Sequence, residues 1–122
     1  MTAKCRYDVA TMSVLAVRVE QAAAKIDLGR GDLARALDAN PRTLLRWLND
    51  ETVPRAEKKE RMLEAIAVFD RLSATLTPAA AHDWLYTPNA ALDHHKPIDL
   101  LRAGEFRQVL GAIDALAEGV FV

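Results

Sequence analysis

The stretch DLARALDANPRTLLRW, residues 32–47, decides the fold of this chain. Its first part carries apolar residues at the spacing of a short helix with one buried face: Leu33, Ala34 and Leu37. Asn40 followed by Pro41 is typical of the cap and first position of a second helix. That second helix turns two residues inward, Leu44 and Trp47. Two short helices joined by so tight a turn predict a helix-turn-helix.

The turn between the two helices carries Asp38 at the position that glycine usually occupies. Aspartate is one of the few residues that accept the left-handed backbone conformation, because its short polar side chain bonds locally. We therefore expect the turn to form at modest cost.

The outward side of the second helix carries side chains that suit nucleic acid, because the second helix of such a unit lies in the major groove of DNA. The candidate DNA-binding residues are Asn40, Arg42, Thr43, Arg46 and Arg55. Arginine can bind guanine O6 and N7 with two hydrogen bonds, and threonine can contact a thymine methyl or a phosphate. Arg55 lies outside this helix and is a candidate for phosphate contacts, as are Arg30 and Arg35. The alternative is that these arginines form an ordinary solvated helix face.

Hydrophobic periodicity predicts helices on both sides of this unit and no strand, so the predicted fold class is all-α. A first helix is expected over residues 9–27, ended by Gly29 and Gly31. A long fourth helix ends by Thr77 and carries one apolar stripe: Met62, Ile66, Phe69, Leu72 and Leu76. We expect a flexible N-terminus over residues 1–8.

We expect the chain to divide into two domains at residue 76. Residues 9–76 are expected to form the helix-turn-helix bundle, and residues 77–122 a small helical domain. Three signals for helix starts lie in the second domain: Thr77-Pro78, Thr87-Pro88-Asn89 and Lys96-Pro97. The large apolar residues of this domain fall on inward helix stripes and are expected in the core, among them Trp84, Leu85 and Phe106.

The C-terminal segment WLYTPNAALDHHKPIDLLRAGEFRQVLGAIDALAEGVFV, residues 84–122, resembles the C-terminal toxin-binding domain of the MbcA/ParS/Xre antitoxins, especially their MbcA branch. The resemblance is carried by Trp84, Thr87-Pro88-Asn89, Leu92, Lys96-Pro97, Asp99-Leu100, Gly104, the spacing to Val109 and Leu110, and the ending AEGVFV. It extends more weakly through the helix-turn-helix, to about residue 12.

The resemblance implies an antitoxin of a RES-Xre module. The toxins of this family have a RES domain and consume NAD by hydrolysis or phosphorolysis, so the implied role is to bind such an enzyme and occlude its NAD pocket. The N-terminal domain is then expected to repress the shared operon, with the chain as a homodimer inside a larger hetero-oligomer. The candidate toxin-binding residues are Lys96, Arg102, Arg107, Glu118, Gly119, Val120, Phe121 and Val122.

The residues of the tail are compatible with that role. Gly119 can end the last helix and free Val120 to Val122 to extend, and three apolar residues are unusual in water. A phenyl ring can fill an apolar slot, and a terminal carboxylate can pair with an arginine of the partner. The alternative is that Val120 and Phe121 fold back onto the core. The three cations, Lys96, Arg102 and Arg107, likewise have plain solvation as their alternative.

Other function classes find little support. The net charge of −1 argues against a general nucleic-acid coat, and the single cysteine, Cys5, fits a reducing cytoplasm. We expect no metal site, because the histidines have no completing ligands, and no cofactor, membrane span or enzymatic activity. The remaining alternative is a free-standing helix-turn-helix regulator whose C-terminal segment only mediates oligomerisation.

Overall fold

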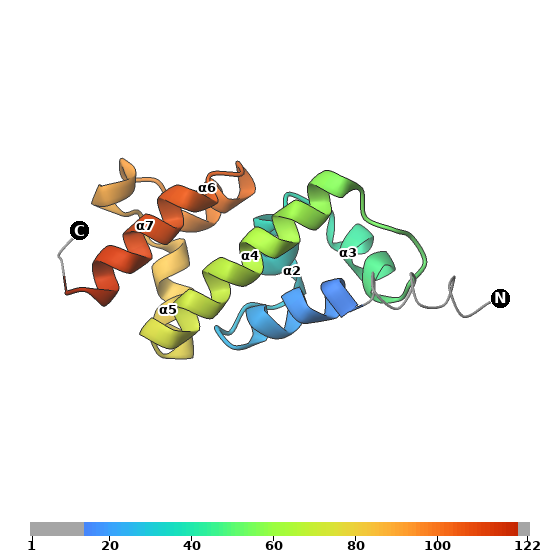
Figure 1. The fold of residues 1–122 in the computed structure, drawn as a ribbon, viewed down its shortest axis with the longest axis horizontal. Helices are drawn as coiled ribbons and strands as arrows, with labels where there is room; N and C mark the ends of the chain where they lie inside the picture. The colour runs from blue at the N-terminus through green and yellow to red at the C-terminus, as the bar shows by residue number, and fades with distance from the viewer. Residues whose placement is uncertain (1–13, 120–122) are drawn as a thin grey trace.

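The computed structural model describes residues 14–119, and within this range the chain is built from helices (Figure 1). The described part of the first helix covers residues 14–24. The elements that follow are α2 (Arg30–Ala36), α3 (Pro41–Leu48), α4 (Ala56–Thr75), α5 (Pro78–Tyr86), the 3-10 helix η1 (Ala90–Leu92), α6 (Pro97–Arg102) and α7 (Phe106–Ala117). Among the described residues there is no strand, and an isolated antiparallel bridge joins Asn89 to His95. The predicted all-α fold class is confirmed.

Helices α2 and α3 form the expected pair of short helices joined by a tight turn, the α2–α3 unit. Helix α3 starts as the sequence indicates, because Asn40 Oδ1 accepts a hydrogen bond from the backbone N of Arg42 at 2.8 Å and Pro41 takes the first position. Asp38 has φ 53°, the left-handed conformation expected in the turn. Lys58 of α4 donates to the carbonyl oxygen of Asp38 at 2.6 Å and fixes the turn against α4.

The first helix ends at residue 24, slightly before the expected bound at residue 27. The break falls at Asp27, which has φ 57°, and Gly29 is the N-cap of α2. Gly31 lies inside α2 and does not end the first helix. The expectation that the two glycines end the first helix is therefore wrong, since aspartate accepts the left-handed conformation and makes the turn first.

Helix α4 runs through the middle of the molecule, with α6 and α7 on one side and the first helix on the other (Figure 1). Its predicted stripe is buried at Met62, Ile66, Phe69 and Leu72. Leu76 differs, because it is the C-cap of α4 with an extended backbone and is only half-buried.

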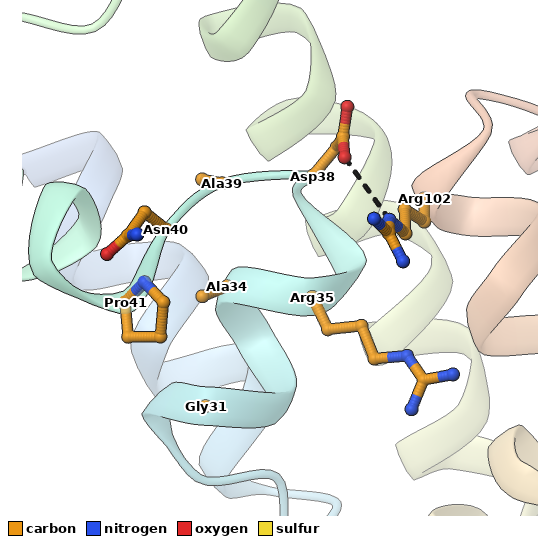
Figure 2. Close-up of a pocket in the computed structure, with 8 residues that line it drawn as sticks. All are labelled: Gly31, Ala34, Arg35, Asp38, Ala39, Asn40, Pro41 and Arg102. Carbon is orange, nitrogen blue, oxygen red and sulfur yellow. Dashed lines mark hydrogen bonds and ion pairs between the residues drawn. The ribbon is translucent and has the colours of Figure 1, made fainter.

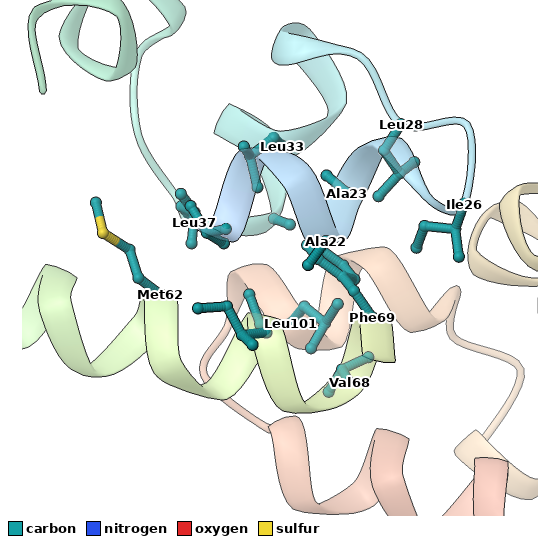
Figure 3. Close-up of a cluster of buried hydrophobic side chains, with 14 of the residues drawn as sticks. Ala22, Ala23, Ile26, Leu28, Leu33, Leu37, Met62, Val68, Phe69 and Leu101 are labelled. Atoms are coloured by element: carbon teal, nitrogen blue, oxygen red, sulfur yellow. The ribbon is translucent and has the colours of Figure 1, made fainter. Parts of the chain in front are cut away.

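One contiguous hydrophobic core joins the first helix, α2 to α7, and so crosses residue 76. Figure 3 shows Leu33 of α2, Leu37 at the C-cap of α2, Phe69 of α4 and Leu101 of α6 converging in it. All four side chains are 4% exposed or less. Burying a leucine or phenylalanine side chain contributes about 1.5–3 kcal/mol, so this shared core dominates the stability of the fold.

The second domain follows its predicted cap signals with one difference. Thr77 Oγ1 accepts from the backbone N of Ala80 at 3.4 Å and caps α5, and Pro97 opens α6. Thr87 was expected to cap the next helix, but its hydroxyl donates to Asp83 O at the end of α5. Asn89 caps η1 instead, accepting from the backbone N of Ala91 at 2.9 Å.

The large residues of this domain differ in depth. Leu85 is fully buried, as expected. Trp84 and Phe106 are only half-buried and pack against the edge of the core. The expectation that Trp84 and Phe106 lie in the core is therefore met only in part.

Candidate functional site

The candidate DNA-binding residues of α3 come together on one face of the molecule. Four of them line a single surface hollow: Asn40, Arg42, Thr43 and Arg46. Leu44 and Trp47 are buried beneath them, as the spacing predicted. Arg42 and Arg46 are exposed, and neither makes an ion pair with any residue in the range 14–119. The arrangement presents two guanidinium groups that have no carboxylate of the described chain to neutralise them.

Arg55 lies next to this surface although it belongs to another element. It is the N-cap residue of α4 and lines a neighbouring hollow with Thr43, Trp47 and Lys58. The structure therefore groups all five candidate DNA-binding residues along α3 and at the start of α4.

The two further candidates for phosphate contacts are placed differently. Arg30 Nε donates to Glu20 at 2.7 Å, and Arg35 Nη2 donates to Asp99 at 2.7 Å. The Arg35 guanidinium also lies over the ring of Tyr86, 5.5 Å from its centroid. Carboxylates hold Arg30 through Nε and Arg35 through a terminal nitrogen, whereas Arg42 and Arg46 have no such partner among the described residues.

The charged side of α2 faces the second domain along what we call the polar seam. Its members are Asp32, Arg35, Asp38, His82, Tyr86, Asp99 and Arg102. Tyr86 Oη donates to Asp32 Oδ1 at 2.5 Å, and Arg102 Nε donates to Asp38 Oδ1 at 3.2 Å. Asp32 and Arg35 lie three apart in α2 and share one helix face, and Asp38 follows in the turn after α2. Exposed ion pairs contribute about 1 kcal/mol or less each, so the seam orients the two parts more than it stabilises them.

Tyr86 is the most perturbed group of the seam. Burial, followed by the hydrogen bond to Asp32 and the charge of Asp32, raises the pKa of Tyr86 from 10.0 to about 12. Arg35 opposes this shift. The phenol therefore stays protonated and donates to Asp32 at neutral pH.

The turn before α3 lies at one end of this seam. A second surface hollow, of about 430 Å³, surrounds it and is lined by Gly31, Ala34, Arg35, Asp38, Ala39, Asn40, Pro41 and Arg102. We call it the turn hollow. Figure 2 shows Arg102 reaching Asp38 from α6, while Asn40 and Pro41 lie on the other side of the turn. Sequence reasoning did not anticipate this approach, because positions 38 and 102 are 64 residues apart.

The candidate toxin-binding residues do not form one cluster. Lys96 is the N-cap of α6, Arg107 lies in the first turn of α7 with its guanidinium 5.9 Å from the centre of the Phe106 ring, and Arg102 points to the turn hollow. Glu118 is the C-cap of α7, eleven residues or roughly 16 Å beyond Arg107 along the helix.

The end of α7 is the last part of the tail that the structure describes. Gly119 has φ 79°, a conformation that favours glycine and ends the helix, as predicted. The expected contacts of Val120, Phe121 and Val122 lie outside the described residues.

Two other classes of site can be addressed within residues 14–119. No group of three or more histidine, cysteine, aspartate or glutamate side chains in that range is placed to hold a metal ion. No helix in the same range is long and apolar enough to cross a membrane.

Comparison with known proteins identifies the class of this chain. Residues 64–119 match the family model of the antitoxin Xre/MbcA/ParS C-terminal toxin-binding domain. The mycobacterial cidal antitoxin MbcA of Mycobacterium tuberculosis strain H37Rv is 40% identical over 111 residues, which cover 91% of this chain and 98% of MbcA. A probable mycobacterial cidal antitoxin of the same organism is 28% identical over 91 residues, covering 75% of this chain and 77% of that relative.

The structural comparison agrees. A chain of the crystal structure of the M. tuberculosis MbcT-MbcA toxin-antitoxin complex superposes with a TM-score of 0.78 and 41% identity, covering 89% of this chain and 98% of that chain. The protein described here is thus of the antitoxin class. It belongs to the Xre/MbcA/ParS antitoxin family, as the C-terminal resemblance predicted.

Proposed function

We propose that this chain neutralises a cognate RES-domain toxin that consumes NAD, and that it does so by binding the toxin through its second domain. The observation that carries the proposal is the similarity to a chain of the MbcT-MbcA complex, which extends over 98% of that chain. The family model covers residues 64–119, so it includes α5, α6 and α7. The partner thus supplies the chemistry, and this chain supplies the surface that blocks it.

The inhibitory element in this proposal is the segment that follows α7. Gly119 ends the helix with φ 79°, so the apolar residues after it are not required to continue the α7 axis. We assign Phe121 to an apolar slot at the NAD pocket, where an aromatic ring excludes water and substrate. Lys96, Arg107 and Glu118 are exposed or half-buried and carry no ion pair among the described residues, so they are available as charged contacts.

The tail mechanism is tested by co-expressing the cognate toxin with the full chain or with a chain truncated after Glu118, while growth and cellular NAD are followed. The truncation removes no core residue described in the structure, so its melting temperature should equal that of the full chain. We expect the full chain to protect growth and the truncated chain to fail. Full protection by a truncated chain would overturn the tail mechanism.

We further propose that the chain represses its own operon through α3. Support comes from the exposed Arg42 and Arg46, which lie over the buried Leu44 and Trp47 on a helix that follows a tight turn. One module of this size buries too little surface for tight specific binding, so the DNA-bound form is expected to be a homodimer within the toxin complex.

A further inference from the structure

The turn hollow contains one basic side chain from the second domain. Arg102, at the end of α6, lies beside the turn that leads into α3 and lines the hollow with Gly31, Asn40 and Pro41. Its side chain is 58% exposed. Only its Nε is engaged within residues 14–119, by Asp38, so its two terminal nitrogens are open to a ligand.

The partners of Asp38 fix the direction of Arg102. The carboxylate accepts from Arg102 Nε at 3.2 Å and lies 4.0 Å from Lys58 Nζ. The backbone carbonyl of Arg102 in turn accepts from Arg61 of α4 at 2.9 Å. Arg102 is therefore held at both its backbone and its side chain, which reduces the entropy lost when its free nitrogens bind an anion.

The position of the hollow points to the phosphate groups of DNA as the anion. When the second helix of such a unit lies in the major groove, the first helix crosses the sugar-phosphate backbone. The turn hollow lies between α2 and the start of α3, so in a complex with α3 in the groove it would face the flanking phosphates. An uncompensated carboxylate at Asp38 would repel those phosphates, and Arg102 both cancels that charge and presents two donors.

Gly31 adds an independent observation. It lies in the first turn of α2, lines the hollow, and has an ordinary φ. A Cβ placed on it would meet no atom within 4 Å, so nothing in the packing of the chain requires glycine there. A glycine without a packing role in a helix is suited to close approach of a ligand to the backbone.

We infer that Arg102 binds a phosphate of operator DNA at the turn hollow, so that the DNA-binding surface extends from α3 onto the second domain. This inference rests on the proposed DNA binding, and it moves Arg102 from the toxin-binding set to the DNA-binding set. The domain that binds toxin then also completes the DNA surface.

The test measures operator DNA binding by the full chain in complex with its toxin over a series of salt concentrations, using fluorescence anisotropy. The variants are Arg102→Gln, Gly31→Ala and Arg102→Gln combined with Asp38→Asn, and the matched control is Arg71→Gln, an exposed arginine of α4 that pairs with Asp114 and lies outside the hollow. Asparagine also accepts the left-handed conformation, so the turn should survive. Thermal melting of each variant checks the fold.

Loss of one phosphate contact reduces the slope of log affinity against log salt by about 1. We expect this reduction, with weaker binding, in Arg102→Gln and in the double variant, and no change in Arg71→Gln. Gly31→Ala should also weaken binding without a lower melting temperature. An unchanged slope in Arg102→Gln, or recovery of wild-type binding in the double variant, would overturn the inference. If the wild-type complex binds no operator DNA, the proposed DNA function itself fails, which is a different result.

Discussion

Asp38 shows how far a single residue can be predicted. Its left-handed conformation follows from the helix-turn-helix spacing and the chemistry of aspartate, and the structure has φ 53° there. Its partners, Arg102 and Lys58, did not follow from the sequence, because they come from α6 and α4 and no local pattern links them to the turn. The same is true of Tyr86 and Asp32, which lie 54 residues apart. Local rules predicted conformations, and the packing of distant helices determined the contacts.

Tyr86 predicts a dependence of stability on alkaline pH. Its pKa is about 12 in the folded chain and near 10.0 when unfolded, so folding favours the protonated phenol. This contribution is fully present below about pH 10 and is lost as the pH rises from about 10 to about 12. Urea unfolding of wild type and Tyr86→Phe between pH 8 and 12 should show an extra loss of stability in wild type. Identical pH profiles would contradict the assignment.

Arg42 and Arg46 predict a separation between DNA binding and toxin neutralisation. If they contact bases, Arg42→Ala or Arg46→Ala should weaken operator binding by about 1–3 kcal/mol each, while protection against the toxin is kept. The reciprocal control is Arg107→Ala, which should weaken toxin binding and leave operator affinity intact. Operator binding that survives both arginine substitutions would move the DNA interface away from α3.

At the scale of elements, helix starts were predicted well and helix ends less well. Asn40, Thr77 and Pro97 mark starts that the structure confirms, because a cap and a proline act on their immediate neighbours. The expected cap at Thr87 was wrong because the Thr87 hydroxyl donates to the backbone carbonyl oxygen of Asp83, on the last turn of α5. Which of two possible hydrogen-bond partners a hydroxyl takes depends on geometry that the sequence pattern does not contain.

Two glycines of the second domain predict opposite effects on stability. Gly111 lies inside α7, and a Cβ on it would meet nothing within 4 Å, so Gly111→Ala should raise the free energy of unfolding by about 0.5–1 kcal/mol. Gly104 has φ 88°, and a Cβ there would lie 3.0 Å from Arg61 Nη2. Gly104→Ala should therefore lower the free energy by about 1–2 kcal/mol. Chemical denaturation compares the two, and a destabilised Gly111→Ala would contradict the open space beside α7.

The molecule as a whole is organised around α4, which packs against α7 and contributes to a core shared by both predicted domains. The division at residue 76 stays a prediction about function, since the buried residues continue across it. Periodicity predicted which helix faces are buried but not which helices those faces meet. That choice depends on the complementary shapes of the helices.

The shared core predicts that both parts unfold together. The two tryptophans report on them separately, because Trp47 is buried in α3 and Trp84 is half-buried in α5. Trp84→Phe keeps Trp47 as its fluorescent reporter, and Trp47→Phe keeps Trp84. During urea unfolding, the fluorescence transition of each variant should coincide with its loss of helical circular dichroism. Two separate transitions within one variant would mean that the domains are energetically independent.

In the proposed function, this antitoxin stops its toxin from consuming NAD by binding the toxin directly. The most direct measurement titrates purified cognate RES-domain toxin with the full chain and follows NAD consumption. The proposal predicts that consumption falls to background as the chain saturates the toxin, and that a chain truncated after Glu118 binds without abolishing it. Undiminished NAD consumption with the toxin fully bound by the full chain would contradict it.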